Sequence, residues 1–426
     1  MLDIKLIREN FDFVKTNLER RKDPAVIELL TKVKVLDEEW RKLKGDLDEL
    51  RHQRNIISEE INRLKKEKKD ASKAIASAKI IPERIKETEG KIDDFEKKIR
   101  DGLLRIPNLL DDSVPYGKDD TENVEVRTGG HIKKHDFELK SHGELAEELG
   151  IADFERSAKI SGTGFYFLKG DLALLNMALI KFVIDFMAKK GYTYIEPPLM
   201  ISRKAYEGVT SLDDFEKVMY KIEYEDAYLI ATSEHPLVSQ HMDETIPEES
   251  LPIKYVGYSC CFRREIGSRG VDTKGLFRTH QFNKVEQVIF CTPEQSQALH
   301  EEITKNSEEI YQALELPYRI VNICTGDMGI VASKKWDLEA WFPRQNKYGE
   351  VGSSSNCTDY QARRLNIKCV DKKGERRVLH TLNNTAIATS RCMVAILENY
   401  QNKDGTVTVP KVLVPYMLGK TKIKSS

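Results

Sequence analysis

The chain has 426 residues, 32% of them charged, and a net charge of −1. Its apolar stretches are too short and too often charged to span a bilayer, and its start lacks the apolar core of a secretion signal. Seven scattered cysteines, without a CxxC pair, indicate reduced thiols and argue against a disulfide framework or a structural zinc site. These features predict a cytoplasmic protein with no membrane partner.

An apolar stripe runs along the N-terminal part of the chain. From Leu29 to Leu64 apolar residues recur at alternating steps of four and three, with one exception at Arg54, and a second stripe runs from Ala78 to Ile99. This spacing is typical of coiled-coil helices. A short polar segment, KKEKKDASK, separates the stripes. Two helices of similar length joined by such a turn predict an antiparallel hairpin.

The predicted tip of this hairpin is basic, and residues 1–110 carry a small excess of Lys and Arg over Asp and Glu. One interpretation is a scaffold or dimerisation coiled coil with a solvated charge run. The other is an arm that presents cations to phosphates. The two helices of a hairpin can bury their apolar stripes against each other and then need no second chain. This favours the second interpretation without excluding the first. The basic tip residues are Arg63, Lys65, Lys66, Lys68 and Lys69.

The rest of the chain predicts an α+β fold. A segment rich in Pro, Gly, Asp and Asn suggests a linker at 106–130, between an arm at 1–105 and a catalytic domain at 131–426. Residues 178–192 have helical periodicity, and strand-like segments follow one another with hairpin-like connections. This order predicts a mainly antiparallel sheet backed by helices. The strand-like segments are 220–232, 252–265, 282–291 and 318–324.

Arginines are the candidates for phosphate binding. No Walker loop occurs, nor a GxGxxG after a strand, so side chains must hold any phosphate. Arg263, Arg278 and Arg391 offer fixed positive charge suited to bidentate contacts. Arg263 and Glu265 lie two residues apart on a predicted strand and share a face, which an ordinary ion pair would also explain.

The surrounding segments are more specific than these single residues. GYSCCFRREIGSRGVDTKGLFRTHQFNKVEQ closely resembles motif 2 of class II aminoacyl-tRNA synthetases, in the form of the seryl enzymes, and residues 381–401 resemble motif 3. The helix at 178–192 leading into IEPPLM resembles motif 1, which forms the dimer. Further segments are similar to other parts of the family, so the resemblance covers nearly the whole chain. They are the arm and residues 325–329, 350–364 and 409–417. It implies an N-terminal helical arm followed by a class II antiparallel catalytic sheet flanked by helices.

The resemblance also implies roles for individual residues. Arg263 and Arg391 would be catalytic, and Glu350 and Ser353 would hold Mg²⁺. The implied serine-binding residues are Thr232, Ser233, Glu234, Arg263, Glu286, Asn383 and Thr385. The implied ATP-binding residues are Arg263, Arg264, Glu265, Arg278, Thr279, Phe282, Glu350, Val351, Gly352, Ser353 and Arg391, with adenine between Phe282 and Arg391. Buried polar partners for a hydroxyl would reject an amino acid that lacks one.

The implied reaction is activation of L-serine by ATP and its transfer to tRNA(Ser), and to tRNA(Sec) where that tRNA is present. The implied enzyme is a homodimer whose arm binds the long variable arm of the tRNA through the basic tip. A rare zinc-dependent seryl type binds serine through a metal with Cys ligands, whereas the implied pocket here has Thr232 and Thr385, so no zinc is expected. Four positions differ from the residues commonest in bacterial members: Arg264, Ile266, Gly352 and Ser354. These differences affect only the fine positioning around the metal and the tRNA end.

Three alternatives remain to be weighed. A threonyl or prolyl enzyme would carry an anticodon-binding domain after motif 3, and an asparaginyl enzyme would begin with a small β-barrel. A coiled-coil interaction protein with an inactive body would be favoured by loss of Arg263, Glu350 or Arg391, all of which are present. A carrier-protein ligase related to the seryl enzymes would lack the arm.

Overall fold

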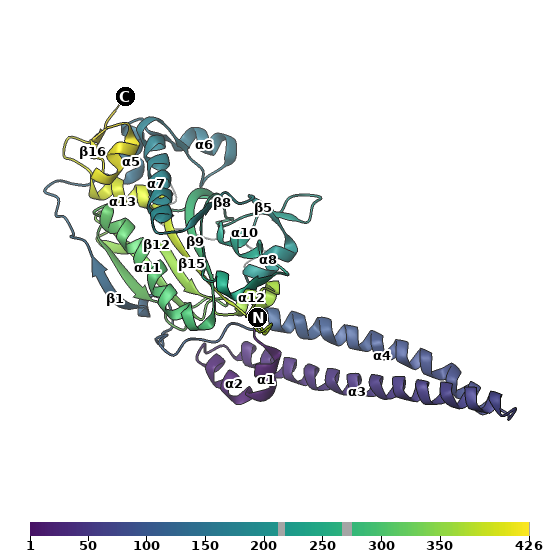
Figure 1. Cartoon of the computed structure of the whole chain (residues 1–426). Coiled ribbons are helices and arrows are strands. Elements are labelled where there is room, and N and C mark those ends of the chain that lie inside the picture. The colour runs from purple at the N-terminus through teal and green to yellow at the C-terminus, as the bar shows by residue number, and fades with distance from the viewer. Residues whose placement is uncertain (212–217, 266–274, 426) are drawn as a thin grey trace. The chain divides into compact units, whose positions relative to one another are not determined.

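The computed structural model describes residues 1–211, 218–265 and 275–425 (Figure 1). The chain divides into two compact units, Leu2–Pro107 and Asn108–Ser426, the second of which also includes Met1. Residues 266–274, which belong to the segment that resembles motif 2, lie outside the described part. The assignment of an arm at 1–105, a linker at 106–130 and a catalytic domain at 131–426 stays a prediction.

The N-terminal unit is helical, as the apolar stripes predict. Two short helices precede the long pair α3 and α4, which run antiparallel as a hairpin (Figure 1). Helix α3 begins where the Asp23 side chain accepts a hydrogen bond from the Ala25 N–H, with Pro24 in the first turn. The helices are α1 (Ile4–Glu9), α2 (Phe11–Glu19), α3 (Pro24–Lys66) and α4 (Ser72–Arg105).

The seam of the hairpin is apolar inside and ion-paired outside. Its buried side chains are Leu47, Leu50, Ile81, Ile85 and Ile92, packed against Trp40, Leu43 and Ile57. Across the two helices, Arg51 lies 2.9 Å from Glu89, and Lys44 lies 3.4 Å from Glu96. These exposed pairs contribute little stability, but they mark which turns of α3 and α4 face each other.

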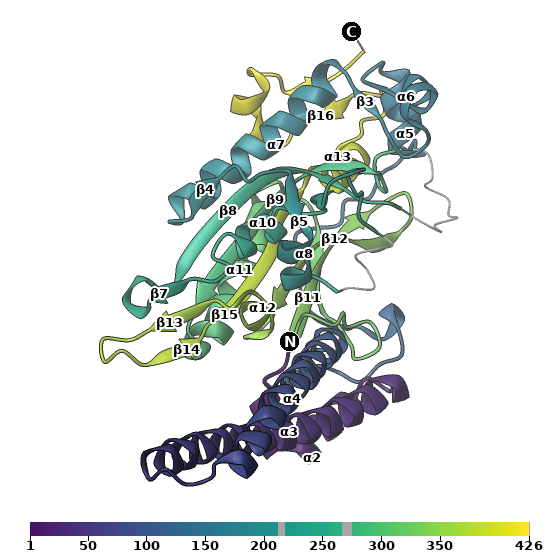
Figure 2. The same ribbon diagram turned by 90° about the vertical axis from the view of Figure 1, so that its right-hand side faces the viewer.

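An eight-stranded sheet forms the centre of the second unit (Figure 2). Its strands run in the order β1-β10-β11-β12-β15-β9-β8-β4, and every neighbouring pair is antiparallel except β4 and β8 at one edge. The predicted mainly antiparallel sheet is confirmed. The strands are β1 (Val124–Gly129), β4 (Thr193–Ile195), β8 (Ile253–Phe262), β9 (Gln281–Cys291), β10 (Tyr318–Asn322), β11 (Lys334–Phe342), β12 (Lys347–Asn356) and β15 (His380–Ala388).

Strand β1 lies inside the segment predicted to be a linker. It pairs antiparallel with β10, with Val124 opposite Asn322 and Gly129 opposite Tyr318. Gly129 is required at this contact, because a Cβ there would come within 2.4 Å of the Tyr318 ring. The turn-rich composition of 106–130 therefore conceals an edge strand.

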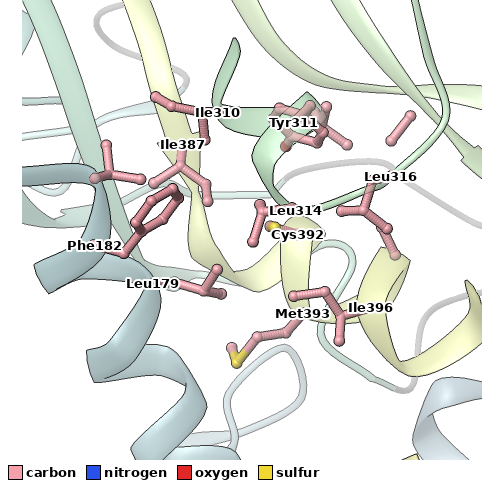
Figure 3. Close-up of a cluster of buried hydrophobic side chains, with 14 of the residues drawn as sticks. Leu179, Phe182, Ile310, Tyr311, Leu314, Leu316, Ile387, Cys392, Met393 and Ile396 are labelled. Atoms are coloured by element: carbon pink, nitrogen blue, oxygen red, sulfur yellow. The ribbon is translucent and has the colours of Figure 1, made fainter. Parts of the chain in front are cut away.

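Three helices cover one face of the sheet with a large apolar core. They are α7 (Gly170–Lys189), α11 (Ser296–Ala313) and α13 (Thr389–Asn399). Figure 3 shows how Leu179 and Phe182 of α7 meet Ile310 of α11, Met393 of α13 and Ile387 of β15. The helix predicted at 178–192 thus overlaps the second half of α7, which begins earlier and ends at Lys189.

A second, smaller core lies on the opposite face. Val288 and Phe290 of β9 pack there, whereas their neighbours Ile289 and Cys291 belong to the larger core. This alternation is what a strand covered on both faces requires. The helices of this layer are α8 (Arg203–Val209), α10 (Glu234–Ser239) and α12 (Tyr360–Leu365).

Short elements complete the unit. Among the described residues, the remaining α-helices are α5 (His142–Glu148) and α6 (Phe154–Ser161), and the 3-10 helices are η1 (Asp120–Glu122), η2 (Glu248–Ser250), η3 (Pro293–Gln295) and η4 (Lys411–Met417). The remaining strands are β2 (Ala152–Asp153), β3 (Phe167–Leu168), β5 (Met200–Ser202), β6 (Ala227–Leu229), β7 (Thr245–Pro247), β13 (Lys368–Val370), β14 (Arg376–Val378), β16 (Val407–Thr408) and β17 (Lys422–Ile423). Within the described ranges, no helix combines the length and the apolar character needed to cross a bilayer.

Three register shifts interrupt the regular pairing of the large sheet, one of them at its edge, between Glu125 and Arg127 of β1. Between β11 and β12, Leu338 lies opposite Gly352 but Glu339 lies opposite Glu350, so Val351 is an extra residue. Between β15 and β9, Thr385 lies opposite Glu286 but Ile387 lies opposite Val285. Each shift is a β-bulge, which changes the face to which the following side chains point.

Candidate active site

The residues predicted to bind serine and ATP gather on the sheet face opposite α7, α11 and α13. On β9, Phe282, Lys284 and Glu286 alternate with core residues such as Val285, so these three side chains share that face. Glu286 lies opposite Gly257 of β8 and Thr385 of β15. Neighbouring strands thus bring together residues from three distant parts of the sequence.

Glu286 is almost fully buried and is held by several donors. Its Oε2 lies 2.7 Å from Lys284 Nζ and accepts a hydrogen bond from Thr385 Oγ1 at 3.1 Å. Its Oε1 accepts one from Asn383 Nδ2 at 3.4 Å. A carboxylate has about four acceptor positions, so Glu286 retains the capacity to accept from a ligand hydroxyl.

A second carboxylate, that of the partly buried Glu234, lies beside the first. Asn383 Nδ2 bridges the two, donating also to Glu234 Oε2 at 3.0 Å, and Gln361 Nε2 donates to Glu234 Oε1 at 2.9 Å. Burial and the nearby negative charge of Glu286 raise the pKa of Glu234 to about 7. An incoming ammonium group would supply the positive charge that Glu234 lacks.

The start of α10 arranges the other residues of this pocket. Thr232 Oγ1 accepts a hydrogen bond from the Glu234 N–H at 3.1 Å. The Ser233 hydroxyl donates to the Gly257 carbonyl at 2.9 Å and is fully buried, so this side chain is engaged in holding α10 against β8. Gly257 is needed for that contact, because a Cβ there would meet Leu237 Cδ1 at 2.6 Å.

Two arginines each lie over an aromatic ring. The Arg263 guanidinium lies 5.3 Å from the centroid of Phe282, and that of Arg391 lies 5.2 Å from the centroid of Phe277. Arg391 Nη1 also donates to the Glu350 carbonyl at 2.8 Å and lies 3.3 Å from its carboxylate. Phe282 therefore faces Arg263 in this structure, and the predicted adenine sandwich of Phe282 and Arg391 stays a prediction.

The segments on either side of residues 266–274 supply further polar groups. Arg278 Nε lies 3.5 Å from Glu265 Oε2, so these two predicted ATP ligands are paired with each other. The Arg264 N–H donates to the Val218 carbonyl, and Thr279 is buried.

The bulge in β12 places the two predicted metal ligands on one face. Glu350 and Ser353 are three residues apart and would point to opposite faces in a regular strand. Because of the bulge they lie opposite Glu339 and Asp337, which are two residues apart on β11 and share a face. The extra residue, Val351, has its side chain in the apolar core, so only its backbone can face a ligand.

These residues fit a magnesium ion. Carboxylate and hydroxyl oxygens are the ligands that Mg²⁺ prefers. Burial raises the pKa of Glu350, but the positive charges of Arg391, Lys335 and Arg263 outweigh that effect and leave it below the ordinary value. Opposite Ser353, Asp337 Oδ1 is buried and has no hydrogen-bond partner among the described residues. Gly352 lies between Glu350 and Ser353 on β12 and has little room for a side chain, because a Cβ there would lie 3.2 Å from the Thr385 carbonyl oxygen.

In the N-terminal unit, the predicted tRNA-binding residues lie at the tip of the hairpin. Arg63, Lys65 and Lys66 end α3, and Lys68 adopts the left-handed conformation in the turn, with φ 54°. Lys69 Nζ lies 2.8 Å from Glu67. Four of these five cations have no ion pair of their own within the described residues.

Three residues near the site were not predicted from the sequence. The sequence could have indicated Lys284, because a residue two positions before Glu286 on a strand must share its face. It indicated Phe277 less clearly, as the neighbour of Arg278. Nothing in the sequence indicates Gln361, because only the folded chain brings α12 to Glu234.

Comparisons with known proteins agree with this geometry. Residues 1–110 match the model of the seryl-tRNA synthetase N-terminal domain, and residues 217–400 match that of the tRNA synthetase class II core domain (G, H, P, S and T). The serine--tRNA ligase of Methanospirillum hungatei is 57% identical over 99% of both chains, and that of Pyrococcus horikoshii is 48% identical over 98% of this chain and 96% of its own.

Solved structures give the same result. The crystal structure of seryl-tRNA synthetase from P. horikoshii complexed with ATP superposes with a TM-score of 0.96 at 47% identity, over 100% of both chains. That of the cytoplasmic serine-tRNA ligase from Naegleria fowleri in complex with AMP gives 0.91 at 37% identity, over 100% of this chain and 99% of that one. With motifs, sheet and arm in agreement, the chain belongs to the seryl-tRNA synthetase family of class II and is an aminoacyl-tRNA ligase.

Proposed function

We propose that this enzyme activates L-serine with ATP, forming seryl-adenylate and pyrophosphate, and transfers the seryl group to tRNA(Ser). The observation that carries the proposal is the buried pocket of Glu234, Glu286, Asn383 and Thr385. It offers one carboxylate for an ammonium group and one acceptor set for a hydroxyl.

Serine fits this pocket by its charges. Glu234 and Thr232 receive the ammonium group, Arg263 receives the carboxylate, and Glu286 with Thr385 receives the hydroxyl. Alanine would leave the buried Glu286 acceptor unsatisfied, which costs binding free energy. Ser233 contributes through the placement of α10.

ATP is held by side chains. Arg263 stabilises the charge that grows on the α-phosphate as pyrophosphate leaves, while Arg391 and Phe282 enclose the adenine. Arg264, Glu265, Arg278 and Thr279 supply further contacts, with the backbone of residues 350–353. Glu350 and Ser353 would hold Mg²⁺, which when bound neutralises part of the triphosphate charge. No zinc is required.

The tRNA is recognised by the helical hairpin. Its basic tip binds the backbone of the long variable arm of tRNA(Ser) by charge and shape, so affinity falls with salt. Where tRNA(Sec) is present, which shares a long variable arm, the enzyme charges it too.

The enzyme acts as a cytoplasmic homodimer built on the segment at 178–200. Met177, Leu199 and Met200 are large apolar residues that this unit leaves exposed, as a subunit contact requires. Light scattering should give about twice the mass of one chain, and an active monomer would contradict the dimer.

The decisive experiment is ATP–pyrophosphate exchange with each amino acid in turn, followed by charging of total tRNA. Serine alone should support strong exchange, and a zinc-specific chelator should leave it unchanged. Better exchange with threonine or alanine would refute the assignment of the pocket.

A further inference from the structure

One buried cation in the pocket has no role in the reaction described so far. Lys284 lies on β9 with Glu286, and its ammonium is 2.7 Å from Glu286 Oε2. The side chains of Lys284 and Glu286 are 7% and 1% exposed. A lysine so enclosed cannot reach a polyphosphate while it pairs with Glu286, so its influence must pass through that carboxylate.

Lys284 pairs with Glu286 on its own strand and also interacts electrostatically with Glu234 at the start of α10. Arg263, after β8, acts on Glu234 as well, so these four charged groups form one set. Burial, Lys284 and Arg263 lower the pKa of His235 well below its ordinary value, so His235 is neutral. Burial raises the pKa of Cys261, which is therefore an uncharged thiol.

Serine brings one positive and one negative group into this set. With Lys284 present, each charge has its own partner: Lys284 with Glu286, the serine ammonium with Glu234, and the serine carboxylate with Arg263. Without Lys284, two adjacent carboxylates compete for one ammonium, and Glu286 draws the ammonium away from Glu234. The serine hydroxyl then loses its place beside Glu286, which weakens its recognition.

We propose that Lys284 is a positioning residue for amino-acid selection, which pairs with Glu286 and keeps that carboxylate aimed at the serine hydroxyl while leaving Glu234 for the ammonium group. This inference rests on the proposed function, because it assumes that serine occupies the pocket. The alternative is a purely structural ion pair, and the two make different predictions.

The test compares Lys284→Met, Glu286→Gln and the double variant in exchange driven by serine and by alanine. Lys284→Met should raise the KM for serine about 100-fold, change the KM for ATP less than about threefold, and lower the serine-to-alanine ratio of kcat/KM at least about tenfold. In the Glu286→Gln background, adding Lys284→Met should change the KM for serine less than about twofold, because Lys284 acts through Glu286.

A matched control separates selection from stability. Lys254, on β8, forms an ion pair with Glu302 at 2.7 Å on the other side of the sheet. Lys254→Met should keep the wild-type serine-to-alanine ratio.

The outcomes are distinguishable. If wild-type enzyme shows no serine-dependent exchange, the proposed function fails. If the wild type prefers serine and folded Lys284→Met keeps both the ratio and the KM, only the role of Lys284 is refuted. If Lys284→Met does not fold, the test compares the KM values for serine of Glu286→Gln and the double variant. The double variant removes both buried charges together, so it leaves no unpaired charge. A clear difference between their KM values for serine would then overturn the inference.

Discussion

The helical hairpin and the catalytic sheet encode their structures in different ways. In the hairpin, residues of one buried cluster, such as Leu50 and Ile85, follow one short repeat, and the pairs Arg51–Glu89 and Lys44–Glu96 share the same register. In the second unit, Glu286 and Thr385 meet through strand pairing, and Glu234, at the start of α10, is joined to Glu286 through Asn383. Local periodicity specifies the first unit, and long-range register specifies the second.

The difference predicts that the two units can be altered separately. The hairpin satisfies its own apolar seam, so its removal should leave the sheet's pocket unchanged. The pocket consists of buried charges that hold one another, so a single substitution there should abolish chemistry without affecting the hairpin.

The largest expected effect comes from shortening the hairpin. Removing residues 48–92 and closing the gap with a short Gly linker keeps the Lys44–Glu96 pair at the new end. Charging of tRNA(Ser) should fall by about 10³-fold or more, because the phosphate contacts of the tip are lost. Serine-dependent exchange, measured on the same preparation, should stay within about twofold of wild type. If the shortened enzyme charges tRNA(Ser) as well as the full chain does, the hairpin is a scaffold and not a tRNA-binding arm.

The next largest effect is expected at the arginines of the pocket. Arg263→Ala and Arg391→Ala should each lower the exchange rate about 10²-fold to 10³-fold, since each removes a preorganised positive contact in the transition state. Binding of tRNA, measured by filter retention, should not change. Arg319→Ala is the matched control, because Arg319 lies on β10 and pairs with Glu339 at 2.6 Å. Near-normal exchange in a folded Arg263→Ala variant would show that its role is misassigned.

Core substitutions should separate the stabilities of the units. Ile92→Ala in the hairpin and Ile387→Ala in the sheet each remove a buried side chain, and each should cost about 2–4 kcal/mol of unfolding free energy. In urea unfolding, Ile92→Ala should shift a hairpin transition alone. The exposed Ile56→Ala should change stability by less than about 0.5 kcal/mol. A single transition shifted equally by both core variants would show that the units unfold together.

The smallest effect concerns pH. The pKa of Glu234 is raised to about 7 by burial and by Glu286, so this carboxyl binds its proton more tightly in the folded protein than in the unfolded chain. Its contribution to stability is therefore present at low pH and is lost as the pH rises towards 7. Serine needs the ionised form, so its KM should fall about tenfold between pH 6 and pH 8. Glu234→Gln should bind serine weakly at both pH values. If the KM for serine still falls between pH 6 and pH 8 in that variant, the titrating group is not Glu234.

Sequence reasoning predicted the hairpin and the mainly antiparallel sheet, because both depend on patterns within short segments. It did not predict that β1 lies within the turn-rich segment or that β4 pairs in parallel with β8, since composition carries no information on strand partners. The roles of Arg263 and Glu286 came from family resemblance. The contact of Gln361 with Glu234 joins residues 127 positions apart, and no local pattern encodes it.

The bulge at Val351 has a consequence for how this gene can change. Deleting that single codon would restore regular pairing between β11 and β12 and would leave Glu350 and Ser353 two residues apart, so their side chains would still share a face. The deletion would remove only the extra backbone unit of Val351 and its side chain in the apolar core. Length variation among descendants of this sequence should therefore concentrate in surface turns, such as the one between β13 and β14, and within β12 the loss of Val351 is a change of length that keeps both side chains on one face.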